Sequence, residues 1–301
     1  MINGIINVYK EKGYTSHDVV AKLRGILKQK KIGHTGTLDP DAEGVLPVCL
    51  GKGTKLCDMF TDKDKTYKAV MHLGIVTDTQ DSSGNILEEK EISFLNENTV
   101  KEKILSFIGE YNQIPPMYSA LKVNGKKLYE LARQGIEVER KARKVFIYDI
   151  KIDKIELPYV TMTVDCSKGT YIRTLCHDIG QALDVGACME HLIRTNVSVF
   201  NIEESLKLCE IERLRDNGEL DNYIKKVDEV FENLLRITMK PEADKLVYNG
   251  NPFTKRDISN ADKNFSKDES YRVYDSKGVF IGIYGYKENG LFKVIKFFMC
   301  D

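Results

Sequence analysis

A short segment near the amino terminus, GHTGTLDP (residues 33–40), gathers residues that could do chemistry. It places the carboxylate of Asp39 and the imidazole of His34 among glycines and a proline. An isolated Asp-Pro pair most often only starts a turn, because Asp hydrogen-bonds its own backbone. Here the segment continues into the apolar, glycine-rich stretch GVLPVCLGKGTK, where a carboxylate needs a partner to stay ionised. Asp39 is therefore a catalytic candidate.

A second candidate lies in SKGTYIR (residues 167–173), between a predicted strand and a predicted helix. Near the start of that helix, Arg173 could pair with a carboxylate such as Asp39 and keep it charged and oriented. The alternative is an ordinary helix start, with Thr170 as the cap and Arg173 in solvent. Tyr67 lies in a predicted strand, where an aromatic residue is also common as part of the core.

Positive charge gathers in two segments of a chain whose total charge balances, with 45 basic and 45 acidic residues. Residues 21–37 contain five Lys or Arg and no acidic residue, and residues 120–144 contain eight against three. Such runs are usually solvated faces. The second segment also contains Tyr129, and Tyr118 lies just before it. Two basic patches with aromatic residues suit a phosphate backbone better than a small ligand.

This sequence lacks the motifs of several other classes of protein. Lys52 and Thr54 resemble the end of a Walker A motif, but Leu46 stands where that motif needs glycine. The histidines and the seven cysteines show no metal-ligand spacing, so we expect no metal site and no cofactor. No apolar run reaches the roughly 18–20 residues that span a bilayer, and the amino terminus lacks a signal peptide. A cytoplasmic protein without membrane contact is expected.

Hydrophobic spacing predicts the strands that must position the candidates. Strands are predicted for IINVYK and TYKAVMHLG, and an antiparallel pair at 145–155 and 158–165. Residues 32–57 are rich in glycine and proline and are predicted to form a loop whose backbone takes conformations that other residues rarely adopt. Asn124-Gly125 predicts a tight turn.

Three helices are predicted in the first two hundred residues. One follows a Thr15 cap, and one follows a Thr99–Glu102 capping box and ends at Gly109. The third covers residues 170–183. Strands and helices in this mixed order, without a regular βαβ alternation, indicate an α+β domain.

The length of 301 residues favours two domains. Residues 196–235 look helical and carry a net charge of minus five, from ten acidic and five basic residues. After them the sequence changes to short strands around an Asn289-Gly290 turn. We therefore predict a catalytic domain at 1–235 and a small β-rich domain at 236–301.

Several of these segments together resemble one known family. GHTGTLDPDAEGVLPVCLGKGTK resembles the signature loop of the TruB family, bacterial pseudouridine synthases that act on uridine 55 of transfer RNA. KEKGYTS is similar to the family motif KPxGxTS, with Glu11 in place of the proline. DKTYKAVMHLGIVTDTQDSSG, IPPMYSALKVNGKKLYELARQG and SKGTYIRTLCHDIG resemble its next blocks in the same order. The likeness covers most of residues 2–200, and residues 236–301 weakly resemble a PUA-type RNA-binding domain.

The resemblance implies roles for individual residues. Asp39 matches the catalytic aspartate, Tyr67 the active-site tyrosine and Arg173 the arginine that pairs with the aspartate. Five further residues are implied to bind substrate: His34, which helps to evert the target, Asp81 in the same tRNA contact network, Tyr171 in the substrate pocket, Leu192 at its floor and Lys10 in the first motif. One departure is HLIRTNV, where family members often have LRRTxxG.

The implied fold is that of the pseudouridine synthases: α+β, with a mixed, largely antiparallel sheet, flanking helices and a small C-terminal β-rich, PUA-like domain. The implied reaction breaks the N1–C1′ bond of uridine 55 in the T loop of tRNA and rejoins the ring through C5. A carboxylate can stabilise or trap an oxocarbenium-like centre at C1′, as in retaining glycosidases. Whether Asp39 forms an ester with ribose, adds to C6 or removes a ribose proton is left open.

Two alternatives to this enzyme are considered. One is a tRNA-binding or tRNA-folding protein that uses the same surface without catalysis. The other is a guide-RNA-dependent pseudouridine synthase, which shares a similar loop and normally works in a complex of partner proteins. The leading hypothesis expects the T arm of tRNA as the partner, no obligatory protein partner and a monomer.

Overall fold

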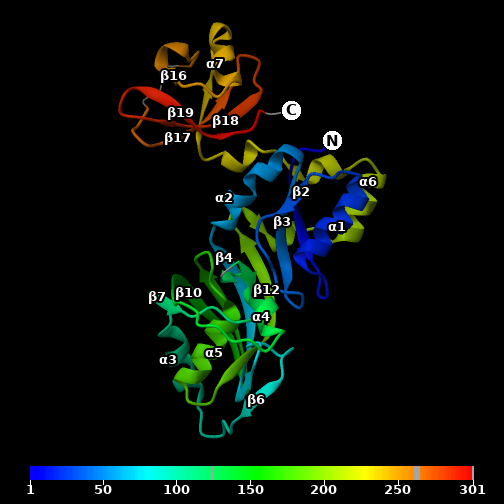
Figure 1. Cartoon of the computed structure of the whole chain (residues 1–301), viewed down its shortest axis with the longest axis vertical. Coiled ribbons are helices and arrows are strands. Elements are labelled where there is room, and N and C mark those ends of the chain that lie inside the picture. Colours follow the sequence, from blue (N-terminus) through cyan, green and yellow to red (C-terminus); the bar gives the residue numbers. More distant parts are fainter. Residues whose placement is uncertain (124, 261–264, 300–301) are drawn as a thin grey trace.

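The computed structural model describes residues 1–123, 125–260 and 265–299. A long mixed sheet forms most of the molecule, and a smaller sheet from the last part of the chain lies at one end of it (Figure 1). Of the predicted Asn124-Gly125 turn, Asn124 lies outside the described residues, as does Cys300. Gly125 lies between two short paired strands, β8 (Lys122–Val123) and β9 (Lys126–Lys127).

The large sheet has ten strands. Eight follow the order β14-β1-β3-β12-β4-β11-β10-β7, with β2 paired to β3 and β13 paired to β12. β12 runs parallel to β3 and antiparallel to β4, so it joins the two halves of the sheet. The bounds are β1 (Gly4–Lys10), β2 (Ile32–His34), β3 (Glu43–Leu50), β4 (Lys65–Leu73), β7 (Gly109–Gln113), β10 (Arg143–Glu156), β11 (Tyr159–Cys166), β12 (Ala187–Val197), β13 (Phe200–Asn201) and β14 (Ile224–Lys225).

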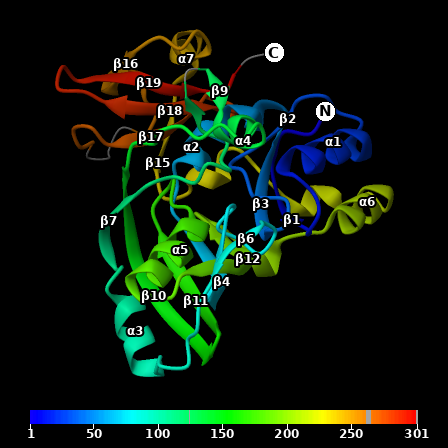
Figure 2. The ribbon, with the colours of Figure 1, turned by 60° about the horizontal axis from the view of Figure 1, so that its bottom comes forward.

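Alternating side chains give β4 one buried face. Its buried residues Tyr67, Ala69, Met71 and Leu73 alternate with more exposed ones. They pack in one core with α5 (Ile172–Ala182) and α3 (Glu97–Leu105), which lie against this part of the sheet (Figure 2). The predictions of β1, β4, β10, β11 and α5 are confirmed.

The predicted loop at residues 32–57 is wrong over much of its length. β2 and β3 form an antiparallel pair there, followed by a 3₁₀ helix at Gly51–Leu56. The glycines and prolines suggested a loop, but at least one glycine is required inside the strand itself. Gly44 in β3 has φ +102°, and a Cβ there would lie 2.2 Å from the carbonyl oxygen of Arg194. The close parallel contact of β3 with β12 therefore requires glycine at this position.

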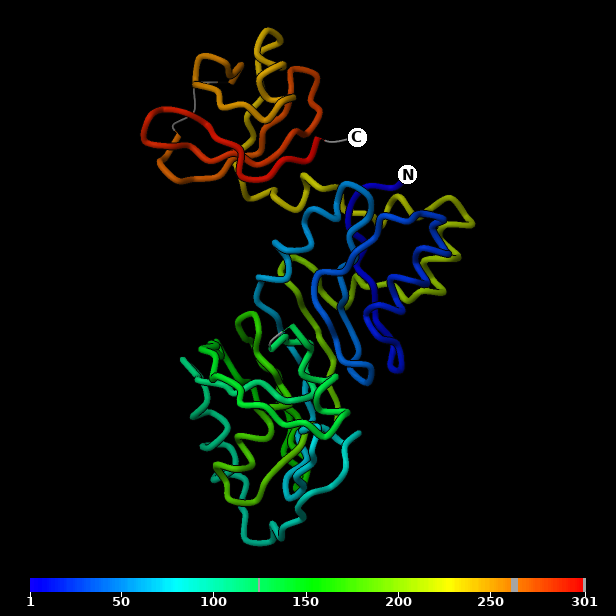
Figure 3. Tube along the Cα trace, in the orientation of Figure 1, coloured from blue at the N-terminus to red at the C-terminus, as the bar shows by residue number. Residues whose placement is uncertain are grey.

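A second layer covers the amino-terminal half of the sheet. α1 (Ser16–Leu27) has Thr15 as its N-cap, as predicted, and the structure adds a capping box in which the Thr15 side chain accepts from the Asp18 N–H. α1 packs with α6 (Leu208–Asp216) over β1 and β3. The trace in Figure 3 shows that the returning yellow segment with α6 runs beside the blue helix α1.

The prediction for α3 was wrong about its ends. Asn96 is the N-cap, and its side chain accepts from the Thr99 N–H at 2.9 Å. The helix ends at Leu105, and Gly109 begins β7. The predicted helical stretch at 196–235 is only partly helical, since it contains α6, the short strands β13 and β14, and three 3₁₀ turns, at Ile202–Glu204, Leu220–Tyr223 and Glu229–Phe231.

The remaining elements are short. α2 (Cys57–Thr61) follows the 3₁₀ helix, and α4 (Leu128–Ala132) follows β9. A separate hairpin is formed by β5 (Ile75–Thr77) and β6 (Ile86–Glu89). Within the described parts of the chain, no helix is both long and apolar enough to cross a membrane.

The second sheet begins at Leu235 and has the order β15-β17-β18-β19-β16. Its core includes Ile237, Tyr271, Tyr284 and Phe292. A further apolar cluster joins the two sheets, with Phe60 and Phe200 on one side and Phe298 on the other. The bounds are β15 (Leu235–Thr238), β16 (Phe253–Thr254), β17 (Ser270–Tyr274), β18 (Phe280–Tyr286) and β19 (Leu291–Phe297), with α7 (Asp244–Tyr248) beside them.

Candidate active site

The loop between β2 and β3 carries Asp39 and is tied down on both sides. The Leu38 N–H donates to the Ser16 hydroxyl at the start of α1, at 2.9 Å. On the other side, the ammonium of Lys10 donates to the Pro40 carbonyl at 3.0 Å. The Asp39 side chain is 41% exposed. The loop thus holds a carboxylate at the surface on a fixed backbone.

Arg173, the second residue of α5, lies in contact with that carboxylate. Its Nε is 2.9 Å from Asp39 Oδ2, while its own side chain is only 4% exposed. The two terminal nitrogens donate to the Thr79 carbonyl at 3.0 Å and the Tyr118 carbonyl at 2.8 Å. One nitrogen also lies 3.6 Å from Asp81 Oδ2. Four contacts from three segments fix the guanidinium, so Asp39 is oriented by a rigid cation.

Asp81 belongs to the polar segment between β5 and β6. Its Oδ1 accepts from the hydroxyls of Thr79 and Ser83, at 2.7 Å and 2.5 Å. The side chain is 18% exposed. It shares Arg173 with Asp39, so the guanidinium balances two carboxylates.

Tyr67 projects from β4 into the same core as Leu38 and Leu192. Burial raises the pKa of its phenol, which therefore remains neutral near pH 7. Leu192 lies on β12 and is 7% exposed. An apolar and aromatic floor thus lies beside the loop of Asp39.

His34 ends β2 at the start of the Asp39 loop. Its ring packs edge-to-face with the ring of His17, with centroids 5.5 Å apart. Its Nδ1 accepts from the Gly36 N–H at 3.3 Å. Burial lowers the pKa of His34, and the neighbouring His17 acts in the same direction. A neutral imidazole can stack on or wedge against a base without an added charge.

Lys10 and Tyr171 are the two remaining candidates. Lys10 is fully buried at the end of β1, and this burial lowers the pKa of its ammonium to about 8. Tyr171 immediately precedes α5, and burial raises the pKa of its phenol. Of the eight candidates, Asp39, Arg173 and Asp81 are linked by direct contacts. Tyr67 and Leu192 share a core with Leu38, the residue before Asp39, and Lys10 binds the Pro40 carbonyl after it.

Sequence reasoning missed Arg194, which lies on β12 in register with Tyr67 on β4. Its side chain is 1% exposed, and its Nε donates to the Val45 carbonyl at 2.8 Å. A Cβ on Gly36 would lie 3.9 Å from one of its terminal nitrogens. This buried cation lies beside the loop that carries Asp39. The available signal was the arginine of HLIRTNV, two residues after Leu192, which the resemblance presents only as part of a divergent motif.

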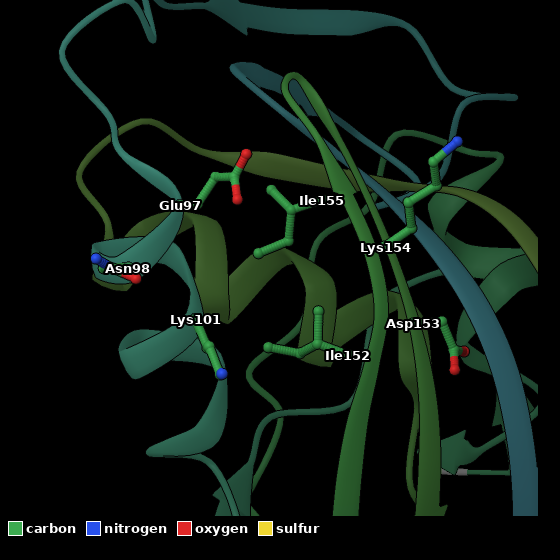
Figure 4. A pocket seen from close by; sticks show the side chains of 7 residues that line it. All are labelled: Glu97, Asn98, Lys101, Ile152, Asp153, Lys154 and Ile155. Carbon is green, nitrogen blue, oxygen red and sulfur yellow. The ribbon is translucent and has the colours of Figure 1, made fainter.

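A pocket of about 300 Å³ lies between α3 and the end of β10, away from this constellation (Figure 4). Charged side chains surround two isoleucines there, and the lining residues are Glu97, Asn98, Lys101, Ile152, Asp153, Lys154 and Ile155. In the described parts of the chain, no group of three or more His, Cys, Asp or Glu side chains is placed to hold a metal ion.

Solved structures place the fold among the pseudouridine synthases. A chain of an H/ACA ribonucleoprotein bound to a substrate RNA containing 2′-deoxyuridine matches with a TM-score of 0.73 and 26% identity, over 99% of this chain and 85% of that one. A chain of an archaeal box H/ACA complex matches with a TM-score of 0.72 and 27% identity, over 99% and 86%. The predicted fold class is confirmed: the protein has the α+β fold of the pseudouridine synthases, with a largely antiparallel sheet and a β-rich C-terminal part.

Sequence comparison then gives the family. The model described as TruB family pseudouridylate synthase, N-terminal domain, matches residues 24–172, and that of the tRNA pseudouridylate synthase B C-terminal domain matches 173–232. The chain is 53% identical to a tRNA pseudouridine synthase B of Lachnoclostridium phytofermentans, over 99% of this chain and all of that protein. It is 46% identical to one of Clostridium kluyveri, with the same coverage. The chain belongs to the TruB family.

Proposed function

We propose that this chain isomerises uridine 55 in the T loop of tRNA to pseudouridine, with Asp39 as the nucleophile. The observation that carries the proposal is the contact of Arg173 with Asp39, at 2.9 Å, in which the cation is buried and the carboxylate faces solvent. Relatives named tRNA pseudouridine synthase B, at 46–53% identity over nearly the whole chain, support tRNA as the substrate.

The reaction needs only a fixed carboxylate and a site for a rotating base. The N1–C1′ bond breaks, a C5–C1′ bond forms, and the proton lost from C5 is balanced by one gained at N1, so no redox partner is consumed. Asp39 stabilises or traps the electron-poor C1′ centre, adds to C6, or takes a ribose proton. In each route the buried guanidinium of Arg173 holds the carboxylate in place until it reacts. Tyr67 and Leu192 supply the surface on which the freed uracil turns.

A uridine inside a folded loop must leave its stack to reach Asp39. Extrusion costs a few kcal/mol of stacking and pairing, which inserted side chains can offset. His34, at the start of the Asp39 loop and packed on His17, is the side chain that we assign to this role. Asp81 and Tyr171 complete the pocket beside Arg173, and Lys10 holds the Pro40 turn.

Phosphate contacts are assigned to the two basic segments. Residues 120–144 lie between β7 and β10 and include exposed Lys122 and Lys126. We further propose that residues 236–301 act as a PUA-like RNA-binding domain and that the preceding residues 1–235 form the catalytic domain. The second sheet begins at Leu235, next to this proposed boundary.

The test is direct: the purified chain is incubated with an unmodified T-arm stem-loop, and pseudouridine is detected chemically. We expect a product at position 55 without any guide RNA or partner protein, and none when that uridine is replaced by cytidine. Tight binding without product would favour the tRNA-binding alternative. Product only with a guide RNA and partner proteins would favour the guide-dependent alternative.

A further inference from the structure

Gln113, the last residue of β7, binds the main chain of Tyr171 with both ends of its amide. Its Oε1 accepts from the Tyr171 N–H at 2.7 Å, and its Nε2 donates to the Tyr171 carbonyl at 3.0 Å. The side chain is 1% exposed. β7 is the edge strand of the large sheet (Figure 2), so Gln113 fastens the sheet edge to the start of α5.

Tyr171 is the N-cap residue of α5, and its side chain makes no capping hydrogen bond. Its carbonyl also accepts from the Leu175 N–H at 3.0 Å, in the first turn of the helix. The first N–H groups of a helix have no acceptor inside the helix, so another residue must provide one. Gln113 therefore replaces a local cap, and it sets the point and direction at which α5 begins.

Arg173 stands two residues further along, and its orientation depends on this helix start. Its contacts with Asp39, the Thr79 carbonyl and the Tyr118 carbonyl each demand a defined position of the guanidinium. Tyr118 belongs to the segment that leaves β7 directly after Gln113. Gln113 thus anchors both the helix that carries Arg173 and the segment that binds it.

We propose that Gln113 is a positioning residue of the active site, which holds Tyr171 in the pocket and, through the first turn of α5, Arg173 against Asp39. This inference rests on the proposed function. Reactive groups displaced by about 1 Å can lose about a hundredfold in rate, so a clamp outside the pocket can control turnover. Gln113 is expected to touch neither the base nor the ribose.

The chain offers a matched control, because a second glutamine makes the same double contact far from Asp39. Gln29 is 8% exposed, its Oε1 accepts from the Ile2 N–H at 2.8 Å, and its Nε2 donates to the Ile2 carbonyl at 3.0 Å. Loss of either clamp removes this pair of hydrogen bonds, and Gln29 also donates from Nε2 to the Lys31 carbonyl at 3.3 Å, so its replacement removes at least as many contacts. A purely structural role predicts the same outcome for both.

The first experiment compares Gln113→Met with Gln29→Met in the full chain. Single-turnover and steady-state rates on the unmodified T-arm stem-loop are measured beside thermal melting. We expect Gln113→Met to lower kcat about tenfold to a hundredfold, with KM changed less than about threefold, because the loss lies in orientation. Gln29→Met should keep kcat within about twofold of wild type at a similar loss of melting temperature.

The second experiment uses Gln113→Glu, which keeps the acceptor for the Tyr171 N–H and loses the donor. Burial beside a carbonyl favours the protonated carboxyl, whose O–H can donate to the Tyr171 carbonyl. The ratio of variant to wild-type kcat should therefore rise as pH falls from about 8 to about 5.5, across the range of a raised carboxyl pKa. The charged or titratable groups around this amide are Tyr111 with its partner Asp178, Arg143 on β10, and Tyr171 and Arg173 on the helix side, and taking the ratio at each pH cancels the titration that variant and wild type share.

The outcomes separate this inference from the proposed function. If wild type makes no pseudouridine, the proposed function fails and this inference fails with it. If wild type is active but Gln113→Met keeps kcat within about twofold, or loses no more than Gln29→Met, only the positioning role is overturned. Should Gln113→Met not fold, the Gln113→Glu ratio decides, because a flat ratio across pH contradicts the role and a rising one supports it.

Discussion

The Nε of Arg173 lies 2.9 Å from Oδ2 of Asp39, yet the two side chains differ sharply in exposure, at 4% and 41%. The ion pair is therefore one-sided. Its cation is held by the Thr79 and Tyr118 carbonyls in the protein interior, while the carboxylate side chain is partly open to solvent. A substrate can approach Asp39 without displacing Arg173, so the pair can remain intact during the reaction.

Asp39→Asn is expected to abolish product in a single-turnover assay. The amide keeps the volume and the turn chemistry of Asp39 but removes the negative charge, and with it nucleophilic and general-base capacity. Binding of the T arm should stay within about tenfold of wild type in a gel-shift assay, or roughly 1.4 kcal/mol. Asp41→Asn, an exposed carboxylate two residues away, is the matched control and should keep its turnover. Wild-type turnover in Asp39→Asn would refute the assignment.

Arg173→Lys should lower kcat strongly although the charge is kept. A lysine ammonium cannot reproduce the guanidinium geometry that joins Asp39 to the Thr79 and Tyr118 carbonyls. Each buried carbonyl left without a donor costs about 1–3 kcal/mol, so chemical denaturation should show a loss of that order. Arg213→Lys, on the exposed side of α6, should change neither property. Equal kinetics in the two variants would show that the geometry of Arg173 is unimportant.

Lys10 should make stability depend on pH in the alkaline range. Burial lowers the pKa of Lys10 from 10.5 to about 8 in the folded protein. Between these values the unfolded chain binds more protons than the folded one, so the free energy of unfolding should rise with pH. The difference in that free energy between wild type and Lys10→Met should therefore grow from about pH 8 to about pH 10 in urea titrations. A difference that is constant or shrinks would contradict this, and exposed Lys12→Met controls for loss of a lysine.

The sequence predicted local structure well where one residue's own chemistry decides it. Thr15 caps α1 as expected, because the hydroxyl of a threonine just before a helical pattern can accept from a backbone N–H of the first turn. For α3 the same rule selected Thr99, although Asn96 accepts the Thr99 N–H. Both residue types cap well, and only the tertiary packing of the helix decides between them.

Contacts between segments that are distant in the sequence could be predicted less well. The motifs indicated that Asp39 and Arg173 could pair, but no pattern indicated that Tyr118 or Thr79 would bind Arg173 through a backbone carbonyl, because every residue type offers one. Arg194 was likewise missed, since its position opposite Tyr67 follows from strand register. Register depends on the whole sheet and is not encoded by neighbouring residues.

Reversing Lys126 and Lys127 to Glu should weaken binding of tRNA and flatten its dependence on salt. Both residues form β9, in the basic segment between β7 and β10, and the Lys127 ammonium lies 5.3 Å from the centroid of the Tyr129 ring. Each phosphate contact releases counterions from the RNA, so losing a contact makes the slope of log affinity against log salt less steep. The change is about 0.9 per lost contact, the value for a B-DNA duplex. Turnover at saturating RNA should stay near wild type, because these side chains fix the backbone and not the base.

The matched control for this charge reversal is Lys151 and Lys154 to Glu. Both are exposed lysines on β10, and each pairs with an acidic neighbour, at 3.3 Å and 2.7 Å. This variant changes the net charge of the chain by the same amount outside the basic segment. If it weakens binding and flattens the salt dependence as much as the change at Lys126 and Lys127 does, the effect comes from net charge alone. If only the change at β9 does so, the contacts are local, and the segment between β7 and β10 lies on the RNA backbone.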